Sequence, residues 1–163
     1  MTALDGEDED VTVRIVAMTP AHIPLIEPFE EEMFGAEAWS ADSYAAELAD
    51  RRHRFYIAAL ADPPQPDLPI LGWAGLMTIG HTAQILTIGV VPAAQRHGIG
   101  QTMLDALLQE ARRRNAEEVL LEVRTDNRAA RRLYERNRFT ALRVRRGYYD
   151  LGRADAVEMR REL

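Results

Sequence analysis

Residues 89–100 read Gly89-Val90-Val91-Pro92-Ala93-Ala94-Gln95-Arg96-His97-Gly98-Ile99-Gly100. An apolar segment at 84–91 predicts a central strand that ends at the proline. The strongest helical periodicity in the chain, over 98–114, begins at the glycines. Glycine leaves backbone amides unobstructed, and a helix N-terminus offers free N–H groups and the positive end of a dipole. The sequence therefore predicts an anion site suited to a pyrophosphate, to which Arg96 can add a charged contact.

Two other interpretations of these residues stay open on the local sequence alone. They can form a strand–turn–helix junction in which glycine serves only the backbone geometry. They can also belong to a dinucleotide-binding fingerprint, because Glu118 or Glu122 follows about 20 residues later. Against the fingerprint, Met103 occupies the position of its third glycine or alanine, and only about 40 residues follow Glu122, too few for a doubly wound sheet.

The amino-acid composition excludes several classes of protein and of functional site. The chain has 163 residues, of which 47% are apolar and 28% charged, as in an ordinary soluble domain. It has no cysteine, which excludes disulfides, thiolate metal sites and cysteine nucleophiles, and its four histidines show no metal-ligand spacing. The N-terminus is acidic, and no apolar run reaches the roughly 18 residues of a membrane span. We therefore expect a cytoplasmic protein that needs no metal and contacts no membrane.

The charge is unevenly distributed along the chain. Residues 1–62 hold 14 acidic and 4 basic groups, a net charge of −10, whereas residues 63–163 hold 12 and 16, a net charge of +4. An acidic first part suits a cationic substrate and a basic second part suits a phosphorylated cofactor, although ordinary solvated surface explains the pattern equally simply. Because no basic stripe is interleaved with aromatic residues, we expect no direct nucleic-acid binding.

Periodicity and turn signals predict the element order. Residues 1–10 should form a disordered acidic tail, followed by one domain at 11–163. Strands are expected at 11–16, 55–61, 70–78, 84–91, 118–124, 139–144 and 156–160, and helices at 19–33, 40–50, 98–114 and 127–137. Pro28 should bend or break the first helix. The order β-α-α-β-β-β-α-β-α-β-β predicts an α/β domain with one mixed sheet of about seven strands flanked by about four helices.

These features resemble a known family. Gln/Arg-x-x-Gly-x-Gly/Ala after such a strand is the hallmark of the GNAT acyltransferases, and residues 95–100 fit it without substitution. The element order is similar to that fold from residue 11 to 163. Three further segments resemble the ribosomal-protein-alanine N-acetyltransferase subfamily: Leu121-Glu122-Val123-Arg124 with Asn127, Tyr134 and Phe139; Ala38-Trp39-Ser40; and Arg145-Arg146-Gly147-Tyr148-Tyr149 with Asp155, Ala156 and Met159.

The resemblance implies transfer of an acetyl group from acetyl-CoA to the N-terminal α-amine of a protein, in particular a small-subunit ribosomal protein that begins with alanine. A free α-amine has a pKa of about 7.7–8.0, so a base must remove a proton, and an acid must neutralise the departing thiolate. The resemblance assigns Glu122 as the general base, directly or through water, and Tyr134 as the general acid. It implies acetyl-CoA contacts for Ile88, Gly89, Val90, Gln95, Arg96, His97, Gly98, Ile99, Gly100, Gln101 and Asn127, and acceptor contacts for Trp39, Tyr148 and Tyr149.

Simpler roles are open for the same residues. Glu122 can be an edge glutamate paired with Arg124, Tyr134 a core tyrosine, and Asn127 a helix N-cap. Two other functions are open as well, a GNAT enzyme that acts on a small-molecule amine and a non-catalytic subunit that binds acyl-CoA. A group of five acidic residues can attract a basic acceptor, although we expect most of them to be plain surface: Glu27, Glu30, Glu31, Glu32 and Glu37.

Two residues depart from the family pattern. Arg138 stands where the family usually has glycine, and it costs roughly 1 kcal/mol if that position needs a positive φ. Ala38 stands where the subfamily often has proline, which predicts a less rigid loop beside the expected substrate groove. Substrate identity is therefore less firmly implied than the reaction.

Overall fold

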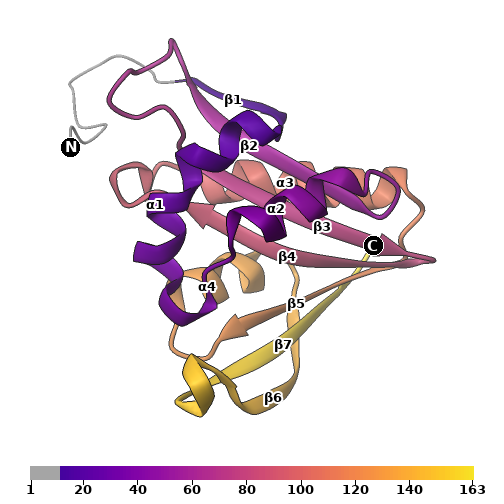
Figure 1. Ribbon diagram of the computed structural model, residues 1–163. Coiled ribbons are helices and arrows are strands. Elements are labelled where there is room, and N and C mark those ends of the chain that lie inside the picture. The colour runs from indigo at the N-terminus through magenta and orange to yellow at the C-terminus, as the bar shows by residue number, and fades with distance from the viewer. Residues whose placement is uncertain (1–11) are drawn as a thin grey trace.

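Residues 12–163, which the computed structural model describes, form a mixed sheet of seven strands in the order β1-β2-β3-β4-β5-β7-β6 (Figure 1). The expected acidic tail lies outside the described residues. The strands are β1 (Thr12–Ala17), β2 (Arg54–Asp62), β3 (Gly72–Ile79), β4 (Thr82–Val90), β5 (Glu118–Arg124), β6 (Thr140–Tyr149) and β7 (Ala154–Glu162). Neighbours are antiparallel except β4 and β5, which are parallel.

Helices cover both faces of this sheet. They are α1 (Ile23–Phe34), α2 (Ala41–Ala49), α3 (Ile99–Arg113) and α4 (Arg128–Arg136). In Figure 1, α1 and α2 lie in front of the strands, and α3 and α4 lie behind them. The predicted apolar stripe of α3 is buried along its whole length: Ile99, Met103, Leu104, Leu107, Leu108 and Ala111. Because each such side chain contributes about 1.5–3 kcal/mol on burial, α3 is firmly held against the sheet, and the loop before it is held with it.

The first helix is continuous across Pro28, so the predicted break is wrong. A proline inside a helix removes one backbone hydrogen bond and adds a clash with the preceding turn. Ile23 and Ile26 before the proline and Glu30 after it are all buried. The tertiary contacts on both sides of Pro28 therefore keep the helix intact.

Strands β6 and β7 are longer than the sequence predicted. The predictions ended the first at Val144 and confined the second to 156–160, whereas β6 continues to Tyr149 and β7 spans Ala154–Glu162. Nearly every residue of β6 is exposed, so the strand lacks the apolar alternation on which the prediction depended. Its pairing with β7 defines it instead.

Helix α4 ends in the turn that the family pattern suggested. Arg138 has a φ of 68°, and its N–H donates to the Glu135 carbonyl (3.1 Å). The N–H of Phe139 donates to the Tyr134 carbonyl (3.0 Å), which completes a Schellman motif. The requirement for a positive φ is confirmed, and an arginine meets it where glycine would do so without strain.

Candidate active site

A gap opens between the two parallel strands of the sheet. The β4–β5 pairing joins only Thr82–Gln84 to Glu118–Leu120. Toward their C-terminal ends the two strands separate, as Figure 1 shows. Ile88, Gly89 and Val90 pair with β3 on one side only, so their other backbone edge faces the gap. An extended ligand can therefore form hydrogen bonds with β4 there, as an added strand does.

The loop from β4 to α3 lies at the end of this gap. Gln95 donates from Nε2 to the Val90 carbonyl (3.2 Å), and Arg96 and Gly98 both have positive φ, 67° and 75°. The side chains of Arg96 and His97 are exposed. Gly98 is the N-cap of α3, and the first backbone hydrogen bond of the helix runs from the Thr102 N–H to the Gly98 carbonyl (3.1 Å). The N–H groups of the first turn are thus available to an anion.

Packing explains one of the two glycines of this region. A Cβ added to Gly89 would lie 3.0 Å from Cζ2 of Trp73, whereas one added to Gly100 would make ordinary contact with Cδ2 of Leu133 at 3.4 Å. Gly89 therefore makes room for the buried Trp73, and packing alone does not require glycine at position 100. A close approach of acetyl-CoA to Gly89 stays a prediction, for which Trp73 packing is a sufficient alternative reason.

The side chains of two predicted cofactor ligands make structural hydrogen bonds. Gln101 and Asn137 exchange reciprocal amide hydrogen bonds of 2.8 Å, which join α3 to the end of α4. The Gln101 Nε2 also donates to Asp105 (2.9 Å). Asn127 caps α4, since its Oδ1 accepts from the Ala130 N–H (3.1 Å). For Gln101, the backbone N–H is the group best placed to meet a ligand, whereas Ile99 has a buried side chain.

Glu122 lies in the part of β5 that has separated from β4. Buried and half-buried residues alternate along β5, so Glu122 shares a face with Leu120 and Arg124, as the sequence predicted. Its side chain is 14% exposed and forms an ion pair with Arg145 of β6. The alternative in which Glu122 pairs with Arg124 is not realised, because Arg124 binds Asp126 at 3.0 Å through two nitrogens.

Tyr134 is buried on α4 with its ring edge-on to Phe139, at 5.7 Å between centroids. Burial raises the pKa of its hydroxyl above the ordinary value of 10.0, so the phenol is protonated at neutral pH. Within residues 12–163, burial is the sole cause of this shift, and no side-chain hydrogen bond of the hydroxyl contributes to it. The proton is therefore free to be donated to a bound ligand.

Tyr148 and Tyr149 form an aromatic pair on β6, and the charge of Glu122 affects the pKa of both hydroxyls. The rings of Tyr148 and Tyr149 meet edge to face at 4.8 Å. A hydrogen bond to the Glu122 carboxylate is the main cause that raises the pKa of Tyr148. Burial, followed by the negative charge of Glu122, raises the pKa of Tyr149, and Tyr134 also contributes. Contacts through Arg145 thus connect Glu122 to the Tyr148–Tyr149 pair, which the sequence singled out separately.

The segment between α1 and α2 contacts the tip of the β6–β7 hairpin. The 3₁₀ turn Gly35–Glu37 packs against the turn Asp150–Gly152, and the Asp150 N–H donates to the Glu37 carboxylate. The next residues of the first segment include Trp39, which is half-buried with its ring 5.3 Å from that of Tyr44. The two segments together border the side of the gap opposite α3 and α4.

Comparisons with known proteins agree with this geometry. A model of the acetyltransferase (GNAT) family matches residues 21–139. The chain belongs to this family. It is 37% identical over 164 residues to the N-alpha-acetyltransferase RimI of Mycobacterium tuberculosis, covering 98% of this chain and 97% of the relative. It is 30% identical over 131 residues to the ribosomal protein bS18-alanine N-acetyltransferase of Escherichia coli, covering 79% and 84%.

Solved structures show the same GNAT fold. The crystal structure of the ribosomal-protein-S18-alanine N-acetyltransferase from Escherichia coli has a TM-score of 0.77 at 26% identity, covering 93% of this chain and 94% of that one. Arabidopsis thaliana NAA60 in complex with acetyl-CoA has a TM-score of 0.81 at 18% identity, covering 93% and 99%, which supports the fold. The predicted single GNAT domain with a mixed seven-stranded sheet and four helices is confirmed.

The described part of this GNAT enzyme was compared with the requirements of a membrane-spanning helix and of a metal site. No helix in residues 12–163 has both the length and the apolar composition to span a membrane. Nor do His, Asp and Glu side chains of these residues gather in groups of three or more that could hold a metal ion.

Sequence reasoning placed Glu30 among the surface acidic residues, and this placement is wrong. Glu30 is 3% exposed and accepts hydrogen bonds from the Trp39 N–H (3.0 Å), the Trp73 Nε1 (3.1 Å) and the Tyr44 hydroxyl. The signal was present in the helical spacing, since Glu30 follows the buried Ile26 by one turn. Because Glu30 anchors Trp39, the loop does not depend on a proline at Ala38 for its position.

Proposed function

We propose that this GNAT enzyme transfers the acetyl group of acetyl-CoA to the N-terminal α-amine of a protein, and that its natural acceptor is a ribosomal protein that begins with alanine. The observation that carries the proposal is the position of Glu122, which is 14% exposed on the part of β5 that no longer pairs with β4 and is joined to Arg145, whose guanidinium lies 4.8 Å from the Tyr148 ring centroid. The names of the relatives from Mycobacterium tuberculosis and Escherichia coli support the same reaction class and acceptor.

Acetyl-CoA fits the gap and the loop at its end by charge and by hydrogen bonding. The pyrophosphate meets the free N–H groups at the start of α3 and the exposed guanidinium of Arg96. The pantetheine arm, which carries amides, runs along the open edge of Ile88, Gly89 and Val90. The thioester is then carried toward Glu122, which lies where β5 is no longer paired with β4.

The reaction removes two protons from the acceptor nitrogen and delivers one to the departing sulfur. Glu122 takes a proton from the acceptor's ammonium, directly or through one water molecule. The neutral amine nitrogen then bonds to the thioester carbonyl carbon as the C–S bond breaks. Tyr134 donates its proton to the departing sulfur, and the second proton of the amine restores the phenol through solvent. The products are an N-acetylated chain and CoA.

Arg145 controls the starting arrangement of this site. Its guanidinium pairs with Glu122 and lies 4.8 Å from the Tyr148 ring centroid. It therefore orients the carboxylate before the acceptor arrives. An acceptor ammonium replaces part of this interaction when it reaches Glu122, because the carboxylate has lone pairs for more than one donor.

A mass-spectrometric assay tests the proposal. The protein is incubated with acetyl-CoA and either of two basic peptides. One peptide has a free N-terminal alanine and no lysine, and the other has a blocked N-terminus and internal lysines. We expect one acetyl group on the first peptide and none on the second.

Other outcomes would redirect the assignment. Acetylation of the lysine peptide alone would overturn the α-amine acceptor but not the use of acetyl-CoA. If neither peptide is modified although acetyl-CoA binds, the peptide acceptor is wrong, and a panel of small amines then separates a small-molecule acetyltransferase from a non-catalytic acyl-CoA-binding subunit.

A further inference from the structure

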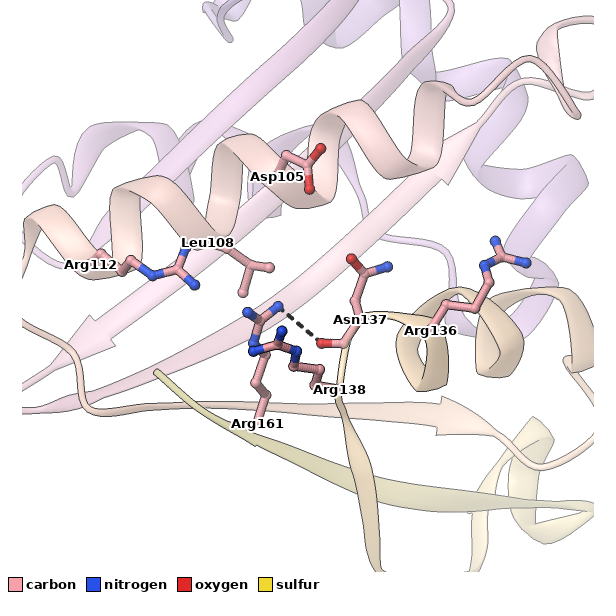
Figure 2. Close-up of a pocket in the computed structure, with 7 residues that line it drawn as sticks. All are labelled: Asp105, Leu108, Arg112, Arg136, Asn137, Arg138 and Arg161. Carbon is pink, nitrogen blue, oxygen red and sulfur yellow. Dashed lines mark hydrogen bonds between the residues drawn. The ribbon is translucent and has the colours of Figure 1, made fainter.

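A cavity of about 340 Å³ lies between α3, the end of α4 and β7. We call it the arginine pocket, and seven residues line it: Asp105, Leu108, Arg112, Arg136, Asn137, Arg138 and Arg161. Figure 2 shows that the guanidinium groups of Arg138 and Arg161 lie next to each other and that Arg112 reaches toward them from α3. Side chains from α3, the end of α4 and β7 thus converge on one cavity.

The positive charge of this pocket is not balanced by the protein. Four arginines and one carboxylate are among the described residues that line it, an excess of three positive charges, although Figure 2 shows the guanidinium of Arg136 pointing away from those of Arg138 and Arg161. That carboxylate, on Asp105, accepts a hydrogen bond from Gln101, and its charge raises the pKa of Arg161 only as the last of four contributions. Within residues 12–163, none of the four arginines forms an ion pair. Like charges at close range raise the free energy of the empty pocket, and an anion would lower it.

The effect of this repulsion is clearest on the pKa of Arg161. Burial and the neighbouring charges of Arg112 and Arg138 lower the pKa of its guanidinium. One of its terminal nitrogens donates to the Asn137 carbonyl (2.9 Å), while its Nε is buried and has no acceptor. An arginine held by one hydrogen bond, with a buried donor left over, has unused capacity for a charged acceptor.

The helix dipoles explain the positions of only two of the four arginines in the pocket. Arg112 and Arg136 lie in the last turns of α3 and α4, where positive charge interacts favourably with the helix dipole. Arg138 and Arg161 lie outside both helices. Arg138 also occupies a backbone conformation that glycine adopts without strain, so the protein places a guanidinium there at a cost in stability.

We propose that the arginine pocket binds a small molecule with two linked phosphate groups, of the nucleoside diphosphate class. The parallel N–H donors of a guanidinium group match two phosphate oxygens in geometry as well as in charge. Two linked phosphates carry about three negative charges at neutral pH, which balances the excess in the pocket. A cavity of about 340 Å³ lies at the lower end of the range for small-molecule sites.

This site is distinct from the loop assigned to acetyl-CoA. Asp105, Leu108 and Arg112 occupy successive turns of α3, whereas the loop precedes the first turn. Leu108 is ten residues beyond Gly98, about 15 Å along the helix axis. The proposal therefore does not depend on the acetyl-transfer reaction, although the Gln101–Asn137 hydrogen bonds connect the two sites.

Calorimetric titration of the full chain with ADP, and separately with inorganic pyrophosphate, tests the proposal. Saturating acetyl-CoA is present throughout, so that the loop before α3 is filled. Arg112→Gln and Arg138→Gly each remove one guanidinium, and the second also relieves a strained backbone, so neither should unfold the protein. Arg132→Gln is the matched control, because Arg132 is exposed on α4 and does not line the pocket. We expect each pocket variant to weaken ADP binding about tenfold and the control to leave it within about twofold.

Each other result would overturn the proposal. Absence of ADP binding, or equal binding by the pocket variants and wild type, removes the site. ADP binding that is seen only in a parallel titration without acetyl-CoA shows that ADP occupies the acetyl-CoA loop and not this pocket. Binding of single-stranded RNA without ADP binding shows that the surface recognises a polymer. Pyrophosphate binding as tight as ADP binding keeps the phosphate chemistry but overturns the nucleoside part. A separate titration with acetyl-CoA alone detects failure of the proposed reaction independently.

Discussion

Glu122 is the residue on which the proposed reaction most depends. Glu122→Gln keeps the shape of the side chain but removes the basic oxygen, so turnover should fall by about 100-fold or more while the affinity for acetyl-CoA stays near that of wild type. Glu118→Gln is a matched control, since Glu118 lies on the same face of β5 and pairs with Arg160. Steady-state kinetics between pH 6 and 9 measure both variants. Near wild-type turnover of Glu122→Gln would remove this residue from the base role.

Tyr134 should affect the rate without affecting stability. Within residues 12–163, no side-chain hydrogen bond of its hydroxyl contributes to its raised pKa, so Tyr134→Phe should slow turnover by about 100-fold while the thermal midpoint stays unchanged. Because burial raises the pKa of the phenol, the acid stays protonated as pH rises, and wild type should show no loss of rate from this group up to pH 9. A falling rate between pH 7 and 9 that disappears in Tyr134→Phe would contradict this assignment.

Arg138 should be a position where substitution stabilises the protein. With a φ of 68°, an arginine costs about 1–2 kcal/mol relative to glycine, of which roughly half is returned because glycine has more freedom in the unfolded chain. Arg138→Gly should therefore raise the free energy of unfolding by about 0.5–1 kcal/mol in a denaturant titration. Arg138→Ala serves as the control, since it keeps the strain and should bring no such gain.

Single residues also mark where sequence reasoning stops. Alternation along β5 correctly put Glu122, Leu120 and Arg124 on one face, because a period of two is fixed by strand geometry. The actual partner of Glu122 was not among the alternatives, because Arg145 comes from a strand 23 residues later and no local pattern carries that pairing. The burial of the Tyr134 hydroxyl and the packing of Trp73 on Gly89 depend on three-dimensional neighbours in the same way.

At the scale of elements, burial decided what could be predicted. Helix α3 and strand β5 have one buried face each, and their predicted positions hold to within about one residue. Strand β6 is exposed along almost its whole length, so its true end at Tyr149 left no apolar pattern. Helix α1 contains two prolines, and only its buried face, which the sequence does display, keeps it whole.

Glu30 should hold α1, β3 and the Trp39 loop together. In Glu30→Ala the Trp39 N–H loses its acceptor, and Tyr44 and Trp73 keep only their mutual hydrogen bond (3.0 Å). We expect the free energy of unfolding to fall by about 2 kcal/mol or more, as measured by denaturant titration. Glu31→Ala, one residue along on the exposed side of α1, should change it by less than about 0.5 kcal/mol. Equal effects of the two substitutions would show that the network contributes nothing to stability.

At the scale of the whole molecule, the gap between β4 and β5 emerges from the arrangement of the sheet. Each of these strands reads as an ordinary apolar strand, and neither contains a residue that signals separation. The gap appears because β5 pairs with β7 over its full length but with β4 over only three residue pairs. Periodicity and spacing along either strand therefore did not predict it.

The uneven charge of the molecule should make acceptor binding dependent on salt. Exposed Glu27, Glu31 and Glu32 lie on α1, which leads into the segment that contacts the β6–β7 hairpin. Their attraction for a basic peptide acts over a Debye length of about 10 Å at 0.1 M salt, so KM for such a peptide should rise several-fold between 0.05 and 0.3 M salt. A neutral peptide with the same first residues should show little change, because it lacks the charges that the salt screens. The double substitution Glu31→Gln and Glu32→Gln should flatten the dependence for the basic peptide and leave turnover at saturation unchanged, since long-range attraction acts on encounter and not on the proton transfers. A dependence equally steep in this variant and in wild type would place the attraction elsewhere on the surface.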